Sequence, residues 1–176
     1  MDKTTTKSIV ADSGISEVYI YRHFENKEDL LAKAFDQLDN EFVEKTMLHL
    51  PVMYTQGLPY KDRCKFFFMA MWEFLLSNRE KCLAFVQYYY SPYFVKVSHE
   101  AHKQRYMPLV KKFSAAFRQE ADVWMILNHI LNVILDFAVK VHNGQMPNDD
   151  SYSEHVFRVV YRSVEQYFKG TEESDS

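Results

Sequence analysis

Six side chains near the start of the chain can donate hydrogen bonds to phosphate oxygens. They are three hydroxyls, one imidazole and two ammonium groups, and groups of these types hold the sugar–phosphate backbone of nucleic acids. Contact with a polyanion is the chemistry that they suggest, provided that the fold brings them to one surface. The residues are Thr5, Thr6, Lys7, Tyr21, His23 and Lys27.

The surrounding pattern predicts two short helices joined by a tight glycine corner. The first covers residues 7–13 and ends at Gly14, where a left-handed residue commonly closes a helix. The second covers residues 17–24 and buries Ile20 and Phe24 on one face. A helix, a short turn and a second helix form the outline of a helix-turn-helix, whose second helix fits the major groove of DNA.

The run G-I-S-x-x-x-I-Y-x-H-F-x-N-K-E-D-L-L, from Gly14 to Leu31, resembles the DNA-binding segment of the TetR family of transcriptional repressors. Ala11 comes one residue later than the usual alanine of that family, and Val10 takes its place. The resemblance implies that the chain binds double-stranded operator DNA. The contacting set that it implies is Thr5, Thr6, Lys7, Ser16, Glu17, Val18, Tyr19, Tyr21, His23 and Lys27.

The resemblance also implies separate roles within this set. Glu17, Val18 and Tyr19 match the positions that read bases, and the latter two suit a thymine methyl group. The phosphate donors match positions that contact the DNA backbone, with the threonines also near a base edge. The other interpretation is a helical hairpin that merely packs, and the number of matching positions argues against it.

One departure from the family concerns the start of the chain. A TetR DNA-binding domain has three helices, and the first normally precedes the threonines by about a dozen residues or more. Here only Met1 to Lys3 precede Thr4. We expect either that this start is internal to a longer natural chain or that the DNA-binding domain is incomplete. The net charge of −3 also indicates that the protein is not a general polyanion binder.

The composition predicts an all-α fold, and the resemblance implies a TetR-like architecture with a helix-turn-helix head and a helical ligand-binding and dimerisation body. Hydrophobic residues make up 47% of the 176 residues, and only 4 Gly and 5 Pro interrupt them. We expect an incomplete DNA-binding domain with its linking helix at 1–42, the body at 43–170 and a disordered tail at 171–176. Cys64 and Cys82 are predicted to be reduced, buried thiols.

Helical periodicity and breaker residues predict the body in more detail. Asn26 caps a linking helix that ends before Pro51, Pro108 bends a later helix, and Ser151 or Ser153 caps the last one. The expected later helices cover residues 60–77, 80–90, 93–117 and 122–142, and the last helix is expected to end at Gly170.

The last two helices are predicted to form the contact between two subunits. The helix at 122–142 is apolar on nearly every side, so it needs cover on two sides. In a TetR body these helices pair with their copies as a four-helix bundle, which implies a homodimer. The helix carries Asn128, Asp136 and Lys140 among its apolar residues, and no signal peptide opens the chain. We therefore expect a cytoplasmic chain without a membrane span.

Aromatic residues in the middle of the chain could enclose a small hydrophobic or aromatic effector, because ligand pockets are mostly apolar with a few placed polar groups. The alternative for each residue is that it belongs to an ordinary core. The candidate lining residues are Met69, Trp72, Phe85, Tyr88, Tyr89, Tyr93, Phe113, Phe117, Trp124 and Asn128.

Two polar groups of the body have both a binding and a structural interpretation. The strip Asn128, Asn132 and Asp136 could hold an effector or a cation, but a hydrogen-bonded seam is favoured. His99 and His102 have the spacing of a loose metal pair, yet without a convincing third ligand they are predicted to be surface histidines. No metal or cofactor site is expected.

The sequence carries no nucleophile elbow, phosphate loop or paired-carboxylate motif, so no enzymatic activity is predicted. The predicted function is a ligand-responsive repressor that binds operator DNA as a dimer and is released by a small molecule. The alternative is a small-molecule-binding dimeric body that no longer reads DNA because the first helix is absent.

Overall fold

The computed structural model describes Val18 and residues 22–169. In this part of the chain, regular structure is helical apart from one isolated bridge between Phe117 and Phe168, which confirms the all-α prediction. The α-helices are α3 (Lys27–His49), α4 (Tyr60–Ser77), α5 (Arg79–Tyr89), α6 (His99–Phe113), α7 (Val123–His142) and α8 (Asp150–Val164). The shorter helices are η1 (Leu50–Tyr54), η2 (Phe94–Ser98), η3 (Ser114–Ala116) and η4 (Glu165–Tyr167).

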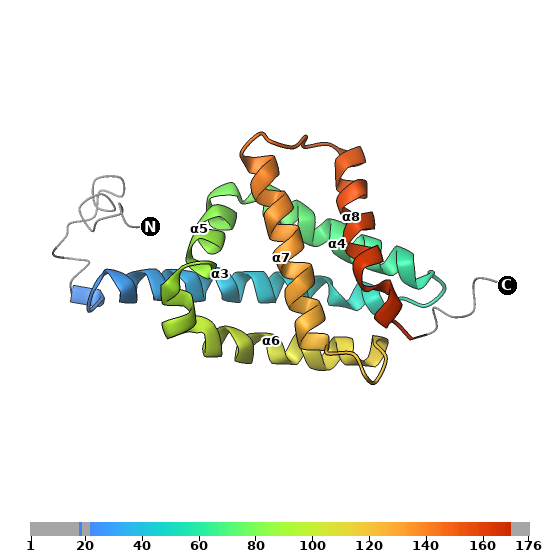
Figure 1. Cartoon of the computed structure of the whole chain (residues 1–176), viewed down its shortest axis with the longest axis horizontal. Helices are drawn as coiled ribbons and strands as arrows, with labels where there is room; N and C mark the ends of the chain where they lie inside the picture. The colour runs from blue at the N-terminus through green and yellow to red at the C-terminus, as the bar shows by residue number, and fades with distance from the viewer. Residues whose placement is uncertain (1–17, 19–21, 170–176) are drawn as a thin grey trace.

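Helix α3 begins where the sequence predicts. The side-chain oxygen of Asn26 accepts a hydrogen bond from the backbone N–H of Asp29 at 2.8 Å, and two acidic residues in the first turn suit the helix dipole. The helix runs for 23 residues along the body (Figure 1). It is therefore the element that joins the start of the chain to everything that follows.

Three helical segments stand where one helix was expected over residues 93–117. A π-helical segment, η2, precedes α6, and a 3-10 turn, η3, follows it, so that the predicted helix over 93–117 is divided. Pro108 lies inside α6, and the helix continues through it to Phe113. The prediction for α4 matches its observed bounds, Tyr60–Ser77.

The last two helices begin at specific N-cap residues. Asp122 caps α7 through the N–H of Met125, and Asp149 caps α8 through the N–H of Tyr152. The predicted serine caps of α8 are wrong, because both serines lie within the helix, where the Ser153 hydroxyl donates to the Asp149 carbonyl.

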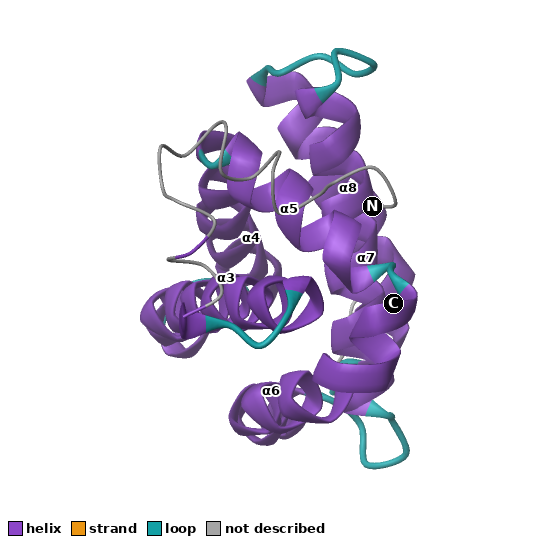
Figure 2. Ribbon diagram, turned by 90° about the vertical axis from the view of Figure 1, so that its left-hand side faces the viewer, coloured by secondary structure: helices purple, strands orange, loops and turns teal. Residues whose placement is uncertain are grey.

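The helices form two sides of one body. Helix α4 contacts both α7 and α8, while α3 contacts α5 and α6. Figure 2 shows α7 on the opposite side of the body from α3, with α6 below. Phe35 on α3 is 1% exposed and packs against Phe85, Tyr88 and Phe94, with ring centroids 4.9, 4.8 and 5.4 Å away. This aromatic cluster fixes α3 to α5 and η2.

The bridge between Phe117 and Phe168 brings the end of the described chain back to the segment after α6. The N–H of Arg118 donates to the Tyr167 carbonyl at 2.8 Å, and the N–H of Lys169 donates to the Ala116 carbonyl at 3.1 Å. The two phenylalanine rings lie 4.9 Å apart. The carboxy-terminal segment is thus bonded to the rest of the body through its backbone.

Among the described helices, α7 alone has the length and apolar composition of a membrane span, and 33% of its most apolar window is buried within the protomer. Core helices pass the same test, so composition does not distinguish the two cases. Much of this helix faces outward and carries apolar side chains there, such as Met125, which is 55% exposed.

Candidate functional site

The described part of the predicted DNA-contacting set is small. Val18 is helical and 64% exposed, His23 is exposed, and Lys27 is the first residue of α3. This position puts the Lys27 backbone at the head end of the linking helix. The other predicted contacts, Thr5, Thr6, Lys7, Ser16, Glu17, Tyr19 and Tyr21, lie outside the described residues.

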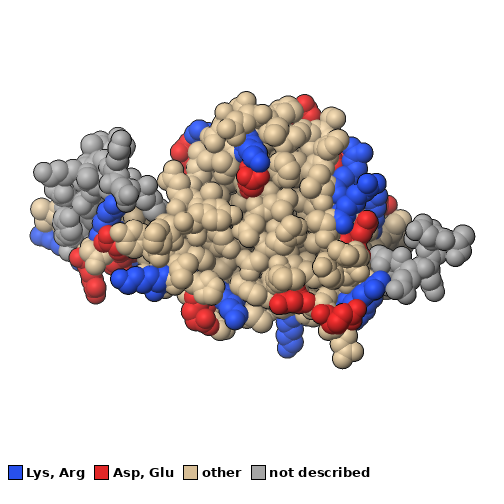
Figure 3. Space-filling model, viewed as in Figure 1, with Lys and Arg blue, Asp and Glu red and all other residues tan. Residues whose placement is uncertain are grey.

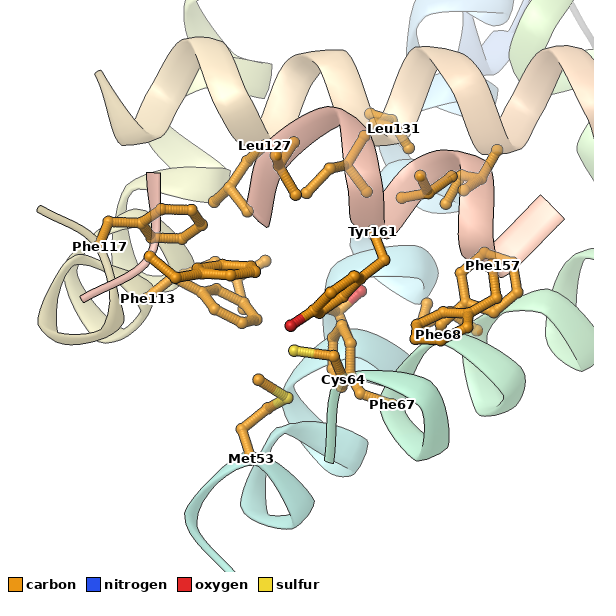
Figure 4. A pocket seen from close by; sticks show the side chains of 18 of the residues that line it. Met53, Cys64, Phe67, Phe68, Phe113, Phe117, Leu127, Leu131, Phe157 and Tyr161 are labelled. Atoms are coloured by element: carbon orange, nitrogen blue, oxygen red, sulfur yellow. The ribbon is translucent and has the colours of Figure 1, made fainter. Parts of the chain in front are cut away.

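An apolar cavity of about 130 Å³ lies among α3, α4, α6, α7 and α8. The long helices that pass it present residues at helical spacing, such as Tyr60, Cys64, Phe67 and Met71 on α4. The facing wall comes from Leu127 and Leu131 on α7 and from Phe157, Val160 and Tyr161 on α8, as Figure 4 shows in part. Among the described residues that line the cavity, none carries a formal charge.

Three polar side chains, those of Tyr60, Cys64 and Tyr161, line this cavity close to one another. Figure 4 shows the Tyr161 hydroxyl and the Cys64 sulfur next to one another near its centre, and Tyr60 lies one helical turn before Cys64. Burial raises the pKa of the Cys64 thiol to about 11, and it also raises the pKa values of Tyr60 and Tyr161. All three groups are therefore neutral hydrogen-bond donors near pH 7.

The structure gives the predicted ligand-lining residues two different locations. Phe113 and Phe117 line the cavity. The others do not, because they belong to neighbouring packing: Trp72 donates to the Ser153 hydroxyl at 2.9 Å, and Tyr88 bonds Ser98 at 3.0 Å. The residues that do not line the cavity are Met69, Trp72, Phe85, Tyr88, Tyr89, Tyr93, Trp124 and Asn128.

Most of the cavity wall was not selected from the sequence. The signal was present on α4 and α8, where aromatic, thiol and hydroxyl side chains recur every three or four residues and include Tyr60, Cys64, Phe157 and Tyr161. The segment at 85–93 is equally aromatic, so the sequence alone did not distinguish it from α4 and α8 as the lining of a cavity. Contact between the two helices, which no local pattern reveals, decides which set surrounds empty space.

The polar strip on α7 is hydrogen-bonded within the protomer. Tyr89 donates to Asn128 at 3.1 Å, Tyr90 donates to Asn132 at 3.2 Å, and Lys140 pairs with Asp136 at 2.7 Å. These bonds agree with the interpretation of the strip as a seam. Within Val18 and residues 22–169, no group of three or more His, Cys, Asp or Glu side chains has metal-binding geometry.

The prediction that His99 and His102 are surface histidines is wrong for His102. Its side chain is 1% exposed, and its Nδ1 lies 3.0 and 3.1 Å from the two carboxylate oxygens of Asp39, which is itself 0% exposed. Arg105 bonds the same carboxylate and also Asp36, at 3.2 Å. His102 and Arg105 lie on α6 whereas Asp39 lies on α3, so this cluster of buried charge joins the two helices. His99 is exposed, as predicted.

We expect the thiol of Cys64 to react slowly in the folded protein. A pKa near 11 in place of 9.0 lowers the thiolate fraction at pH 8, so iodoacetamide should alkylate Cys64 about ten- to a hundredfold more slowly than the unfolded chain. Because the pKa is raised, the rate should grow with pH up to about 11. Peptide mass spectrometry would measure it, with the more deeply buried Cys82 as internal reference. Rapid modification that is independent of pH between 8 and 10 would contradict this assignment.

Comparison with known proteins addresses the first 34 residues and the fold separately. The family model described as bacterial regulatory proteins, tetR family, matches residues 1–34. A search of curated proteins found no match.

Solved structures with a similar fold include tetR family transcription regulators from Marinobacter aquaeolei VT8 and Shewanella sp. PV-4. The first has a TM-score of 0.72 at 13% identity and covers 93% of this chain and 85% of its own. The second has a TM-score of 0.67 at 18% identity, with 91% and 86% covered. A TetR family protein from Vibrio parahaemolyticus gives 0.60 at 15% identity, with 92% and 87% covered.

At these identities the structures establish the fold, and the matched amino-terminal segment establishes the kind of DNA-binding element. Residues 1–34 therefore match the tetR family of bacterial regulatory proteins, and the described part of the chain has the fold of tetR family transcription regulators.

Proposed function

We propose that this TetR-type regulator is a homodimeric repressor that leaves its operator when a small, neutral, apolar molecule enters the cavity. The observation that carries the proposal is that α3, the helix leading from the DNA-binding segment, supplies Phe42 and Thr46 to the wall of the cavity. An occupant of the cavity therefore touches the element that positions the DNA-binding segment.

The lining of the cavity defines the chemistry of the effector. A charged molecule would lose its hydration without gaining an ionic partner, which is unfavourable in an apolar site. A volume of about 130 Å³ is close to that of an engineered apolar cavity of roughly 150 Å³ that binds benzene. We infer a compact aromatic or aliphatic molecule, and the donors Tyr60, Cys64 and Tyr161 favour one that carries a hydrogen-bond acceptor.

The proposed release is a shift between two positions of α3. Typical effector pockets of roughly 300–1,000 Å³ exceed this cavity, so a larger occupant must separate the surrounding helices. In a dimer, moving α3 changes the separation of the two recognition helices, and only one separation matches successive major grooves. A coupling of about 1–3 kcal/mol between the effector and DNA sites is usual for such a change.

The outward surface of α7 and α8 supports the dimer. Met125 is 55% exposed and Val159 is 46% exposed, and Figure 3 shows few charged side chains over α7 on this face. A second copy seated there by two-fold symmetry would cover these apolar groups and build a four-helix bundle. The proposed repressor is therefore a dimer that binds the operator and leaves it when the effector binds.

Toluene should raise the melting temperature of the protein, because it binds the folded state alone. At a hundred times its Kd the expected stabilisation is about 2.7 kcal/mol, which corresponds to several degrees. Benzoate, of similar shape but charged, should give no shift. Leu131→Trp should abolish the toluene effect by filling the cavity, whereas Leu58→Trp, at a position outside the cavity lining, should leave it intact. An equal response to toluene and benzoate would rule out the uncharged cavity as the site.

Placing a carboxylate on the proposed interface should dissociate the dimer. Val159→Asp buries an unpaired charge at the contact, so the dimer Kd measured by sedimentation velocity should rise at least about tenfold. Val95→Asp introduces the same change at a residue that is 74% exposed on η2, and it should leave the Kd unchanged. A wild-type protein that sediments as a monomer at micromolar concentration would refute the dimer.

Substitutions at phosphate-contacting residues and at base-contacting residues should change DNA binding in different ways. Lys27→Ala and Tyr21→Ala should weaken all sequences about alike, and Lys27→Ala should reduce the salt slope by about one. Tyr19→Ala should instead relax base preference by about 1–3 kcal/mol at one position. Fluorescence anisotropy on the promoter next to the gene would measure this, with Lys45→Ala, far along α3, as the control. Identical effects of all three substitutions would contradict the assigned roles, and an unchanged anisotropy with every sequence would leave only a ligand-binding dimer.

A further inference from the structure

The buried charge cluster of Asp39, His102 and Arg105 is the strongest polar connection between α3 and α6. The Asp39 carboxylate has no exposure, and the partners that the structure gives it come from α6: His102 Nδ1 contacts both oxygens, and Arg105 contacts one. A buried carboxylate is tolerated only while such partners stay in place, since losing one leaves an uncompensated charge. The position of α3 against α6 is therefore tightly constrained at this point.

The same two helices line the cavity directly next to the cluster. On α3, Phe42 and Thr46 follow Asp39 by one and two turns and reach the cavity. On α6, Tyr106 follows His102 by one turn and also reaches it. The cavity and the cluster thus occupy successive turns of one helix pair.

Tyr106 separates the cavity from the cluster. Its ring lines the cavity and lies 4.4 Å from the His102 ring, centroid to centroid, while the side chain is 6% exposed. Burial and the negative charge of Asp39 raise the pKa of its hydroxyl well above the usual value, so it remains a protonated donor. An occupant that pushes against Tyr106 therefore pushes against His102.

The cluster also has unused hydrogen-bonding capacity. In the described structure, His102 Nε2 is buried without a hydrogen-bond partner, and the Tyr106 hydroxyl lies next to the Asp39 carboxylate without a hydrogen bond of standard geometry to it. Buried polar atoms without partners are uncommon, and stored strain is one of the reasons for which they persist. A small shift of α6 could exchange the present bonds of Asp39 for others, which is how a packed interface acquires two discrete states.

We propose that Asp39, His102 and Arg105 form a latch that holds α3 against α6, and that a molecule entering the cavity opens it by displacing Tyr106. This inference rests on the proposed function, because it takes the cavity as the effector site. The latch residues are positioning residues, and they do not touch the effector.

A second ion pair of α3 provides a matched control. Glu41 pairs with Lys81 on α5 at 2.5 Å, but both side chains are substantially exposed, at 31% and 48%. Exposed pairs contribute little because water screens them. Glu41→Gln therefore removes a carboxylate from α3, two residues from Asp39, without touching the latch.

Hydrogen exchange of the full chain, followed by mass spectrometry with and without saturating toluene, tests the latch. In the wild type we expect toluene to speed exchange of α3 amides at 36–46 about tenfold, relative to the first turn of α3. Asp39→Asn should show the faster exchange without toluene, and toluene should then add less than about twofold. Glu41→Gln should behave as the wild type does.

Arg105→Gln is the second variant, because its side chain is 16% exposed and lies at the edge of the cluster, where a change is better tolerated. It should share the phenotype of Asp39→Asn. If toluene raises the melting temperature but leaves the exchange of α3 unchanged, or if either latch variant responds as the wild type does, the latch is wrong and the effector cavity stands. If toluene does not bind saturably, both proposals are overturned.

Discussion

A carboxylate that water does not reach lies in the middle of the helix that leaves the DNA-binding segment. Asp39 needs His102 and Arg105 on the neighbouring helix, and this requirement fixes where α3 can lie. Apolar packing around Phe35 would permit small sliding motions, since ring contacts are not directional in the way that a charged hydrogen bond is. The ionic contact therefore sets the register of the helix pair, and the aromatic contacts supply the burial.

The body combines two interiors with different properties. Around Phe35 the rings of α3, α5 and η2 fill the available space, and their hydroxyls bond within the protomer, as Tyr88 does with Ser98. Between α4, α7 and α8 the rings leave about 130 Å³ unfilled, and neutral donors face it. One interior holds the linking helix in place, whereas the other can accept a guest, and α3 and α6 extend through both.

Sequence reasoning succeeded where local chemistry decides the outcome. Asn26 caps α3, and the helix at 60–77 has its predicted bounds. The amino-terminal motif predicted the family that the comparison supports. Each of these features depends on residues within a few positions of one another.

Features made by distant residues escaped prediction. Asp39 and His102 are 63 positions apart, so nothing near either residue revealed that the histidine is buried. The cavity was expected among ten candidates between Met69 and Asn128, but of these only Phe113 and Phe117 line it, and the packing of α4 and α8 places the empty volume beside Tyr60 and Tyr161. Aromatic content predicts large side chains, and only the packing of whole helices determines where they fail to fill space.

The backbone bridge between Phe117 and Phe168 also gives the chain's far end a share in the shape of the cavity. Both rings line the cavity, so this part of its wall is formed by two segments that meet only after the chain has folded back on itself. An empty, ordered chamber can therefore exist only late in folding. Fraying of the turn that carries Phe168 would open the cavity to solvent at this wall while leaving α7 and α8 in place.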